Sequence, residues 1–380
     1  MHILIAPDSF KDSLSARDAA RAIATGVRRA LPDAKITERP LGDGGEGTLD
    51  AVLAATGAEA RQAKAQDPLG REVSATWGWI ASRRTAIVEL AEASGLQRLS
   101  RAERNACTTT TYGVGQLIKE ALDAGAEHLI LTLGGSATND GGSGMMMALG
   151  ARFLDDDDTP IPPGGASLAL LARIDTSGLD ERLSRLTVEA AVDVDNPLCG
   201  TRGASAVFGP QKGATPAQVE QLDQALSHLA DIAAKTFTMD QRDTPGAGAA
   251  GGMGYAALTF LNATLRPGIA LVMEQVGCLE VMERADLVIT GEGQLDGQSL
   301  SGKTPIGVAR AARDRGIPAV ALVGRLGDGW QAVFNEGINS AFALADGPMT
   351  LDEALPRTAE LLADRAESVI RLWQASHARQ

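Results

Sequence analysis

The sequence predicts an α/β protein in which a Rossmann-like, doubly wound parallel sheet domain carries a large inserted α/β domain. At 380 residues the chain exceeds the usual size of one domain. Near both ends of the chain, short apolar runs typical of buried parallel strands alternate with polar or glycine-rich loops and helical patterns. The middle of the chain departs from this alternation, which is why we expect an insertion there.

The first part of the chain contains two strand–loop–helix units. Ser15 with Asp18 three residues later is a helix start signal, and apolar residues then recur at helical spacing. Both loops follow the carboxyl end of a strand, which is where ligands collect in open parallel sheets. The predicted elements are a strand over 2–6, a helix from 16 to about 31, a strand near Ile36 and a helix over 48–55.

The middle part begins after Gly57 and has some antiparallel character. Asp67-Pro-Leu-Gly-Arg71 is typical of a turn, and apolar side chains then alternate along one strand from Val73 to Trp79. The four acids 155–158, beside three prolines, indicate an exposed loop without a functional role. The other predicted elements are strands over 86–90, 128–133 and 187–192, and helices over 114–124, up to 149, over 215–237 and after 254.

The regular alternation returns after Asp286. The predicted elements are strands over 286–290, 318–323 and 340–343, and helices over 305–315, from Trp330 and from about 351. We therefore expect one discontinuous Rossmann-like domain, residues 1–66 plus 285–380, and one inserted domain, residues 67–284. The active-site cleft is expected between the two domains.

The composition limits the classes of partner. The formal net charge of −13 argues against nucleic-acid binding, and an anionic substrate would need local Lys or Arg side chains or a metal ion. The 3 cysteines are far apart and the 4 histidines are scattered, which indicates buried thiols in a reducing compartment rather than a metal cage. We expect no signal peptide, because MHILIAPD is too short and uncharged for one, and no run reaches ~18 apolar residues. We expect a cytoplasmic protein without membrane partners.

Glycine-rich loops precede helices at four places. Glycine permits positive φ and close backbone approach, so such a loop can present N–H groups to an anion. One loop of this kind is equally typical of an ordinary helix entry, but four of them, three containing an acid, favour a function. The loops cover residues 42–47, 134–144, 248–254 and 291–302.

Acidic residues lie at or just after several predicted strand ends. A carboxylate there is unfavourable unless it is solvated, paired or bound to a metal ion. Magnesium needs one or two carboxylates together with phosphate oxygens, and a hydroxyl that accepts a phosphoryl group needs a base or an orienting carboxylate. Helix capping is the alternative role, and it suits Asp195 better than Asp43. The acids concerned are Asp43, Asp193, Asp195, Glu292 and Asp296.

The segment 297–304 matches the phosphate-loop pattern G-x-x-x-x-G-K-[ST]. A phosphate loop must leave a buried strand directly, whereas the predicted strand ends at Thr290, seven residues before Gly297. We therefore interpret the match as incidental and expect Thr304 to cap the helix before Pro305. The segment is instead expected to form one wall of a phosphate site.

Several motifs together resemble the bacterial glycerate kinase family of the glycerate 2-kinase type, in colinear order from residue 2 to about 325. One departure is Asp12, at a position where the family usually has glycine. The motifs are Pro7-Asp-Ser-Phe-Lys11, Leu41-Gly-Asp-Gly-Gly-Glu-Gly-Thr48, Asp67-Pro-Leu-Gly70, Leu133-Gly-Gly-Ser-Ala-Thr-Asn-Asp-Gly-Gly-Ser-Gly144, Asp193-Val-Asp-Asn-Pro-Leu198, Phe208-Gly-Pro-Gln-Lys-Gly-Ala214 and Thr290-Gly-Glu-Gly293.

The resemblance implies magnesium- and ATP-dependent phosphorylation of D-glycerate to 2-phosphoglycerate, in glyoxylate or sugar-diacid breakdown. Phosphorylation to 3-phosphoglycerate, a P-loop ATP hydrolase and a non-catalytic binding protein are the alternatives, and the oligomeric state is open between monomer and homodimer. The candidate residues are, for catalysis, Asp193, Lys11 and Lys303; for substrate or phosphate binding, Ser9, Gly44, Gly45, Gly134, Gly135, Ser136, Thr138, Asn139, Asn196, Gly291 and Gly293; and for magnesium, Asp43, Glu292 and Asp296.

Overall fold

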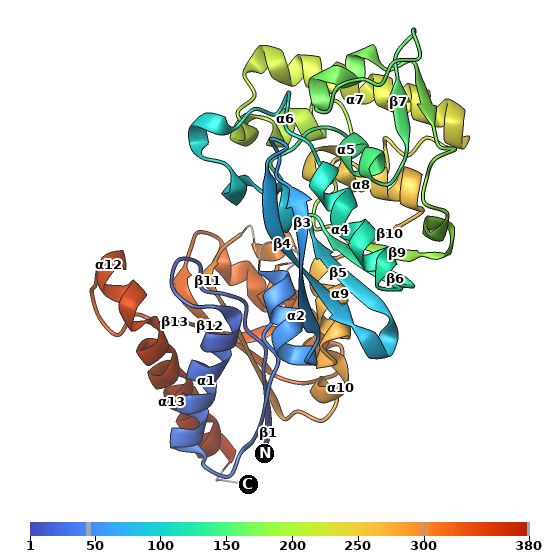
Figure 1. Cartoon of the computed structure of the whole chain (residues 1–380). Helices are drawn as coiled ribbons and strands as arrows, with labels where there is room; N and C mark the ends of the chain where they lie inside the picture. Colours follow the sequence, from blue (N-terminus) through green and yellow to red (C-terminus); the bar gives the residue numbers. More distant parts are fainter. Residues whose placement is uncertain (43–46, 298, 302, 378–380) are drawn as a thin grey trace. The chain divides into compact units, whose positions relative to one another are not determined.

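A computed structural model describes residues 1–42, 47–297, 299–301 and 303–377 (Figure 1). The candidate residues Asp43, Gly44 and Gly45 lie outside the described residues. Contacts within the chain divide it into two compact units. Unit 1 comprises residues 1–43, 50–57 and 269–380, and unit 2 comprises residues 44–49 and 58–268.

The boundaries of these units differ from those expected at residues 66 and 285. The strand after Gly57 pairs within unit 2, and the helices that follow Gly268 belong to unit 1. Compact units are not by themselves independent folding domains, so the domain boundaries, and the cleft expected between the domains, stay predictions.

Unit 1 contains a five-stranded parallel sheet in the order β13-β12-β11-β1-β2. From β1 the chain winds outward to β2 on one side, and from β11 it winds outward to β12 and β13 on the other. The order therefore reverses between β1 and β11, and this reversal confirms the predicted doubly wound sheet, in its flavodoxin-like order. The strands are β1 (His2–Ile5), β2 (Lys35–Glu38), β11 (Leu287–Leu295), β12 (Ala319–Leu326) and β13 (Ile338–Ala343).

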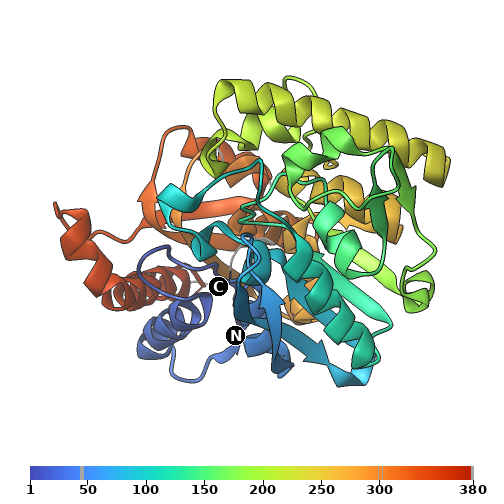
Figure 2. The same cartoon turned by 45° about the horizontal axis from the view of Figure 1, so that its top comes forward.

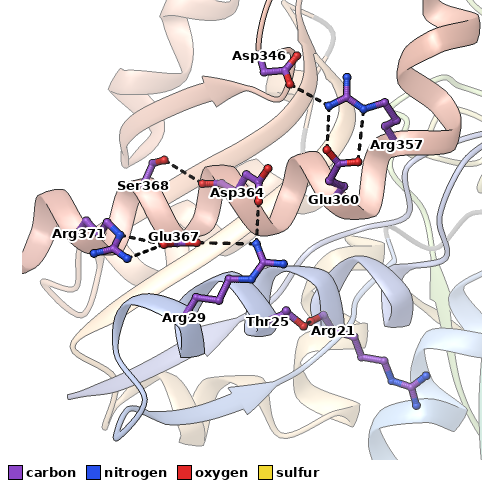
Figure 3. Close-up of polar contacts among 10 residues, drawn as sticks. All are labelled: Arg21, Thr25, Arg29, Asp346, Arg357, Glu360, Asp364, Glu367, Ser368 and Arg371. Atoms are coloured by element: carbon purple, nitrogen blue, oxygen red, sulfur yellow. Dashed lines mark hydrogen bonds and ion pairs between the residues drawn. The ribbon is translucent and has the colours of Figure 1, made fainter.

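Two helices, α1 (Ala16–Ala30) and α13 (Thr358–His377), lie side by side in unit 1 (Figures 1 and 3). The predicted cap is present, since Ser15 accepts a hydrogen bond from the Asp18 N–H. Arg29 joins the two helices through a 2.8 Å contact with Asp364 (Figure 3). The remaining helices are α2 (Thr48–Thr56), which belongs to unit 1 from Asp50 onward, α9 (Gly268–Gln275), which belongs to it from Ile269 onward, α10 (Cys278–Met282), α11 (Thr304–Arg313) and the short α12 (Leu351–Ala354).

Unit 2 contains a six-stranded mixed sheet in the order β10-β9-β6-β5-β4-β3. The four strands from β10 to β5 are parallel, whereas β4 is antiparallel to both β5 and β3. A separate two-stranded ladder joins β7 (Arg152–Leu154) to β8 (Arg173–Asp175). The strands of the main sheet are β3 (Glu59–Gln66), β4 (Glu72–Ile80), β5 (Thr85–Glu89), β6 (His128–Thr132), β9 (Thr187–Ala191) and β10 (Thr264–Arg266).

The core of unit 2 lies between this sheet and its helices. Trp77 of β4, Leu131 of β6, Leu229 of α7 and Tyr255 of α8 belong to one buried cluster. Figure 2 shows the long α7 (Pro216–Phe237) next to α8 (Ala249–Leu261). The shorter helices are α3 (Leu90–Ser94), α4 (Tyr112–Asp123), α5 (Ser143–Ala148) and α6 (Ala204–Phe208). No helix among the described residues is both long and apolar enough to cross a membrane.

Three expectations about elements were wrong or incomplete. The strand expected to end at Thr290 continues to Leu295, because β11 pairs with β12 as far as Leu326. The helix expected from Trp330 is a 3₁₀ helix, Trp330–Glu336. β3 was not predicted, because its sequence is polar and its hydrogen bonds come from complete antiparallel pairing with β4.

Candidate active site

The reversal of strand order in unit 1 is the point where open parallel sheets bind ligands. The loop after β1 folds back on itself there, with the Phe10 N–H donating to the Leu14 carbonyl at 2.8 Å and the reverse bond at 2.9 Å. Lys11 is exposed at the tip of this turn, next to Asp12, which adopts a φ of +62°. Ser13 Oγ lies 2.7 Å from Thr358 Oγ1 and so anchors the turn to α13.

This loop packs directly on β11. The Asp8 N–H donates to the Gly291 carbonyl at 2.8 Å. A Cβ at Gly291 would lie 2.0 Å from the Leu322 carbonyl oxygen, whereas one at Gly293 would lie 3.4 Å from the Lys11 nitrogen. Strand packing therefore accounts for Gly291, while Gly293 lies beside the turn that carries Lys11.

Two of the predicted magnesium ligands lie around one buried serine. Ser299 Oγ donates to Glu292 Oε1 at 2.9 Å, and the Ser299 N–H donates to Asp296 Oδ1 at 3.3 Å. Gln294 Nε2 holds the other oxygen of Asp296 at 2.6 Å. Glu292 is only 7% exposed, so these hydrogen bonds offset the loss of water around a carboxylate.

The residue types at this place fit magnesium. The described residues contain no group of three or more His, Cys, Asp or Glu side chains that would form a complete metal cage. Magnesium, however, is usually held by one or two carboxylates and completes its octahedron with phosphate oxygens and water. Glu292 and Asp296 meet that requirement, whereas Asp43 lies outside the described residues.

The start of α11 corrects the role expected for Thr304. Lys303 is the N-cap residue and Thr304 is the first helical residue, followed by Pro305. The Thr304 hydroxyl donates to Asp8 Oδ2 at 2.6 Å, while the Ser9 N–H donates to Asp8 Oδ1, also at 2.6 Å. Asp8 thus connects the loop after β1 to α11, a role that the sequence did not reveal. The side chain of Lys303 makes no hydrogen bond among the residues that the structure describes.

In unit 2, β5 is the first of the parallel strands along the chain, and it ends with Glu89, which is 3% exposed. Its carboxylate accepts hydrogen bonds of 3.1 Å from the N–H groups of Gly47 and Leu49, at the start of α2. An acid at a helix start is favourable because the N–H groups there have no partner within the helix. Sequence reasoning missed Glu89, whose position at the end of a predicted strand was the available signal.

The loop after β6 contains a fully buried carboxylate, that of Asp140. It accepts hydrogen bonds from the Thr111 N–H at 2.8 Å, from the Thr111 hydroxyl at 2.9 Å and from the N–H groups of Gly142 and Gly144 at 3.2 Å. Burial nevertheless raises the pKa of Asp140 above its usual value. These bonds fix the glycine-rich turn that opens α5.

A buried lysine holds the other half of the same loop. Lys212 is 1% exposed, and its Nζ donates to Ser136 Oγ and to the Thr138 carbonyl, both at 2.7 Å. Burial lowers the pKa of Lys212 to about 7. Lys212 lies in the motif Phe208-Gly-Pro-Gln-Lys-Gly-Ala214, but the sequence predicted no role for it.

The candidate residues of this loop differ in their access to solvent. Thr138 and Asn139 are fully buried, and Asn139 Nδ2 donates to Ser205 Oγ at 2.9 Å. Ser136 keeps 6% of its surface exposed. A Cβ at Gly251 would lie 2.0 Å from the Thr138 carbonyl oxygen, so the glycine-dense start of α8 packs closely against this loop. Among the three, Ser136 is therefore the residue best placed to contact a ligand.

The two acids after β9 that were considered as catalytic bases have different partners. Asp193 is exposed, and its Oδ1 accepts a hydrogen bond from the Gly268 N–H at 2.9 Å. Asp195 instead forms a 2.8 Å ion pair with Arg202, whose carbonyl accepts from Asn196 Nδ2 at 2.7 Å. A backbone hydrogen bond therefore orients the Asp193 carboxylate.

The described candidate residues thus form two sets, each near the carboxyl ends of the parallel strands in its own sheet. Such edges with lysines, carboxylates and glycine-rich loops define a phosphate-handling α/β protein. The set in unit 1 is Ser9, Lys11, Gly291, Glu292, Gly293, Asp296 and Lys303, and the set in unit 2 is Gly134, Gly135, Ser136, Thr138, Asn139, Asp193 and Asn196.

Comparison with known proteins identifies the family. The model of the glycerate kinase family matches residues 3–374, and this chain belongs to that family of enzymes. It is 48% identical to the glycerate kinase of Bacillus subtilis, with 97% of each chain covered, and 47% identical to the glycerate 2-kinase of Escherichia coli, with 93% of each covered. A crystal structure from Salmonella typhimurium LT2, assigned as a glycerate kinase 2, is 46% identical and superposes with a TM-score of 0.91 over 100% of this chain and 99% of that one.

Proposed function

We propose that this chain transfers the γ-phosphoryl group of ATP to O2 of D-glycerate, giving 2-phosphoglycerate and ADP. The observation that carries the proposal is the 47% identity to a glycerate 2-kinase over 93% of both chains. Family membership and the lysines and carboxylates at the sheet edges support the same reaction. We further propose that the enzyme acts in the cytoplasm, as a monomer or a homodimer.

We propose that the residues of unit 1 handle the phosphate groups. Lys11 and Lys303 offset the charge of the transferring phosphoryl group, and the backbone around Ser9 and Gly293 borders it. Glu292 and Asp296 hold magnesium directly or through water, with Ser299 fixing their orientation. When bound, magnesium would neutralise charge on the phosphate oxygens.

Within unit 2, we propose that Asp193 orients the acceptor hydroxyl and takes its proton. Its exposure and the backbone hydrogen bond that orients its carboxylate suit this role. Asn196 and Ser136 would contact the carboxylate or hydroxyl oxygens of glycerate. Gly134 and Gly135 leave space for that contact at the end of β6.

The contact between Thr304 and Asp8 disfavours the P-loop hydrolase as an alternative. A P-loop directs the hydroxyl of its Ser or Thr to magnesium, whereas the Thr304 hydroxyl donates to Asp8. The extension of β11 to Leu295 removes the other argument against a P-loop, since the strand now ends close to Gly297. A non-catalytic binding protein is disfavoured by membership of a kinase family.

Phosphorus NMR of the reaction products tests the proposal. With ATP, magnesium and D-glycerate, we expect the resonance of 2-phosphoglycerate to appear together with ADP, and neither to appear without the acceptor. The resonance of 3-phosphoglycerate in place of the 2-phosphate would contradict the regiochemistry. ADP formation independent of glycerate would instead favour the hydrolase.

A further inference from the structure

The contact between Lys212 and Ser136 fixes the direction of a hydrogen bond. An ammonium group has three donors and no acceptor, so at the 2.7 Å contact the serine oxygen must accept. The hydroxyl hydrogen of Ser136 therefore cannot point at Lys212. It is available to an acceptor elsewhere, and the positive charge behind the oxygen makes the hydroxyl a stronger donor.

Lys212 and Ser136 differ in exposure in a way that gives this donor a direction. Lys212 is 1% exposed, and its second hydrogen bond, to the Thr138 carbonyl, also lies inside unit 2. Ser136, four residues after the end of β6, is 6% exposed and so is not completely enclosed. A hydroxyl whose oxygen accepts from a buried ammonium group keeps its own hydrogen for another acceptor, and an anionic oxygen suits that role.

We propose that Lys212 is a positioning residue that fixes the Ser136 hydroxyl as a hydrogen-bond donor to a carboxylate oxygen of D-glycerate. This inference rests on the proposed function, because it assumes that glycerate is the acceptor substrate. Lys212 itself touches no substrate and acts through Ser136.

The protonation of Lys212 controls this arrangement near neutral pH. Burial is the main cause that lowers its pKa to about 7, and the negative charge of Asp140 in the same loop opposes that shift. Among the described residues, Arg104 also lies nearby, since its guanidinium donates to the carbonyl of Gln211, the residue before Lys212, at 3.4 Å. Once neutral, the amine can accept a hydrogen bond from Ser136, and the hydroxyl is then no longer available to substrate.

The Michaelis constant for D-glycerate, measured from pH 6 to 9 at saturating MgATP, tests this mechanism. Glycerate stays ionised over this range, because carboxylic acids titrate near pH 4. We expect KM to rise about tenfold through pH 7 in the wild-type enzyme, with a smaller change in kcat. In Lys212→Met and Ser136→Ala, KM should be high and independent of pH. Lys235→Met, which removes an exposed lysine at the end of α7, should keep the wild-type profile.

The double variant Lys212→Met/Ser136→Ala separates positioning from general support of the fold. If Lys212 acts through Ser136, the double variant should have the KM of Ser136→Ala alone. The proposal would be overturned if KM in the double variant rose by the product of the two single effects. It would also be overturned if KM of Ser136→Ala still rose through pH 7. The latter measurement remains decisive if Lys212→Met does not fold. Absence of glycerate phosphorylation by the wild-type enzyme at every pH would instead contradict the proposed function.

Discussion

The hydroxyl of Thr304 donates a 2.6 Å hydrogen bond to the carboxylate of Asp8, a residue 296 positions earlier in the chain. This bond joins the first loop of unit 1 to the first residue of α11, at the point where the strand order reverses. It also occupies the hydroxyl that a phosphate loop would direct to magnesium. In the segment that matches the phosphate-loop pattern, this hydroxyl therefore makes a structural hydrogen bond where a phosphate loop would have a metal ligand.

Replacing Thr304 tests which role its hydroxyl has. Thr304→Val removes the donor and leaves Asp8 without this hydrogen bond, so we expect the free energy of unfolding to fall by about 1–2 kcal/mol. Thr304→Ser keeps the hydroxyl and should keep the wild-type free energy of unfolding. Turnover in a coupled assay with glycerate should fall less than tenfold in Thr304→Val, because the loop is loosened and no metal ligand is lost. Loss of magnesium-dependent turnover by several orders of magnitude would show that the hydroxyl binds the metal.

The arrangement of Glu292, Ser299 and Asp296 predicts that substitutions there raise the magnesium requirement of the enzyme by different amounts. Glu292→Gln removes one proposed ligand charge, and we expect the magnesium concentration for half-maximal activity to rise about 10–100-fold. Ser299→Ala should raise it by a smaller factor, because the serine orients the carboxylates without holding the ion. Asp314→Asn, at an exposed acid just after α11, serves as the control. Equal magnesium requirements in all four enzymes would exclude this site.

Asp193 is expected to act on the acceptor hydroxyl. Asp193→Asn preserves the shape of the side chain and its hydrogen bond from the Gly268 N–H, but the amide cannot take a proton. We expect kcat to fall by about 10²–10⁴-fold with little change in KM for ATP. The matched control is Asp195→Asn, which breaks an exposed ion pair with Arg202. Wild-type turnover in Asp193→Asn would refute the assignment.

The parts of the fold that the sequence predicted are those with local signals. Buried parallel strands such as β1 and β6 are mostly apolar, and Ser15 with Asp18 marks the start of α1 by a contact between near neighbours. β3 escaped prediction because its residues become a strand only by pairing with β4. The extension of β11 past Thr290 likewise depends on its partner β12. Tertiary pairing, rather than local preference, decided both cases.

The same distinction applies to the candidate site. Glu292 and Asp193 could be named as candidates because each acid follows a predicted strand end in the sequence. Asp8, Glu89 and Lys212 were missed because their partners lie 296, about 40 and about 75 residues away. In the sequence alone, a charged residue that distant segments bury cannot be distinguished from a charged residue at the surface.

Asp12 combines a backbone effect with a charge effect, and two variants separate them. Its φ of +62° is unfavourable for a residue with a Cβ, so Asp12→Gly is expected to raise the free energy of unfolding by up to about 1 kcal/mol. Asp12→Asn keeps the side-chain size and should leave stability nearly unchanged. Both variants remove a negative charge beside Lys11, and both should lower KM for ATP several-fold. If only Asp12→Gly lowers KM, the backbone rather than the charge controls the Lys11 turn.

The buried ammonium of Lys212 predicts how the stability of the protein depends on pH. The pKa of this group is about 7 in the folded protein, against 10.5 for an ordinary lysine. Between these two values the unfolded chain binds a proton that the folded protein lacks, so Lys212 makes the free energy of unfolding rise with pH. The slope approaches about 1.4 kcal/mol per pH unit within that window and vanishes below pH 7, where both states are protonated.

Urea unfolding at pH 7, 8 and 9 measures this slope. Other groups also titrate in the range, so the informative quantity is the difference between the wild-type protein and Lys212→Met. Lys212→Met lacks the contribution of this lysine, so its free energy of unfolding should rise less with pH than that of the wild type. The difference, variant minus wild type, should therefore be most favourable to the variant at pH 7. Lys235→Met, with an exposed lysine removed, should follow the wild type. A constant difference between wild type and Lys212→Met at all three pH values would mean that Lys212 keeps its proton in the folded protein, and the switch at Ser136 would then have no basis.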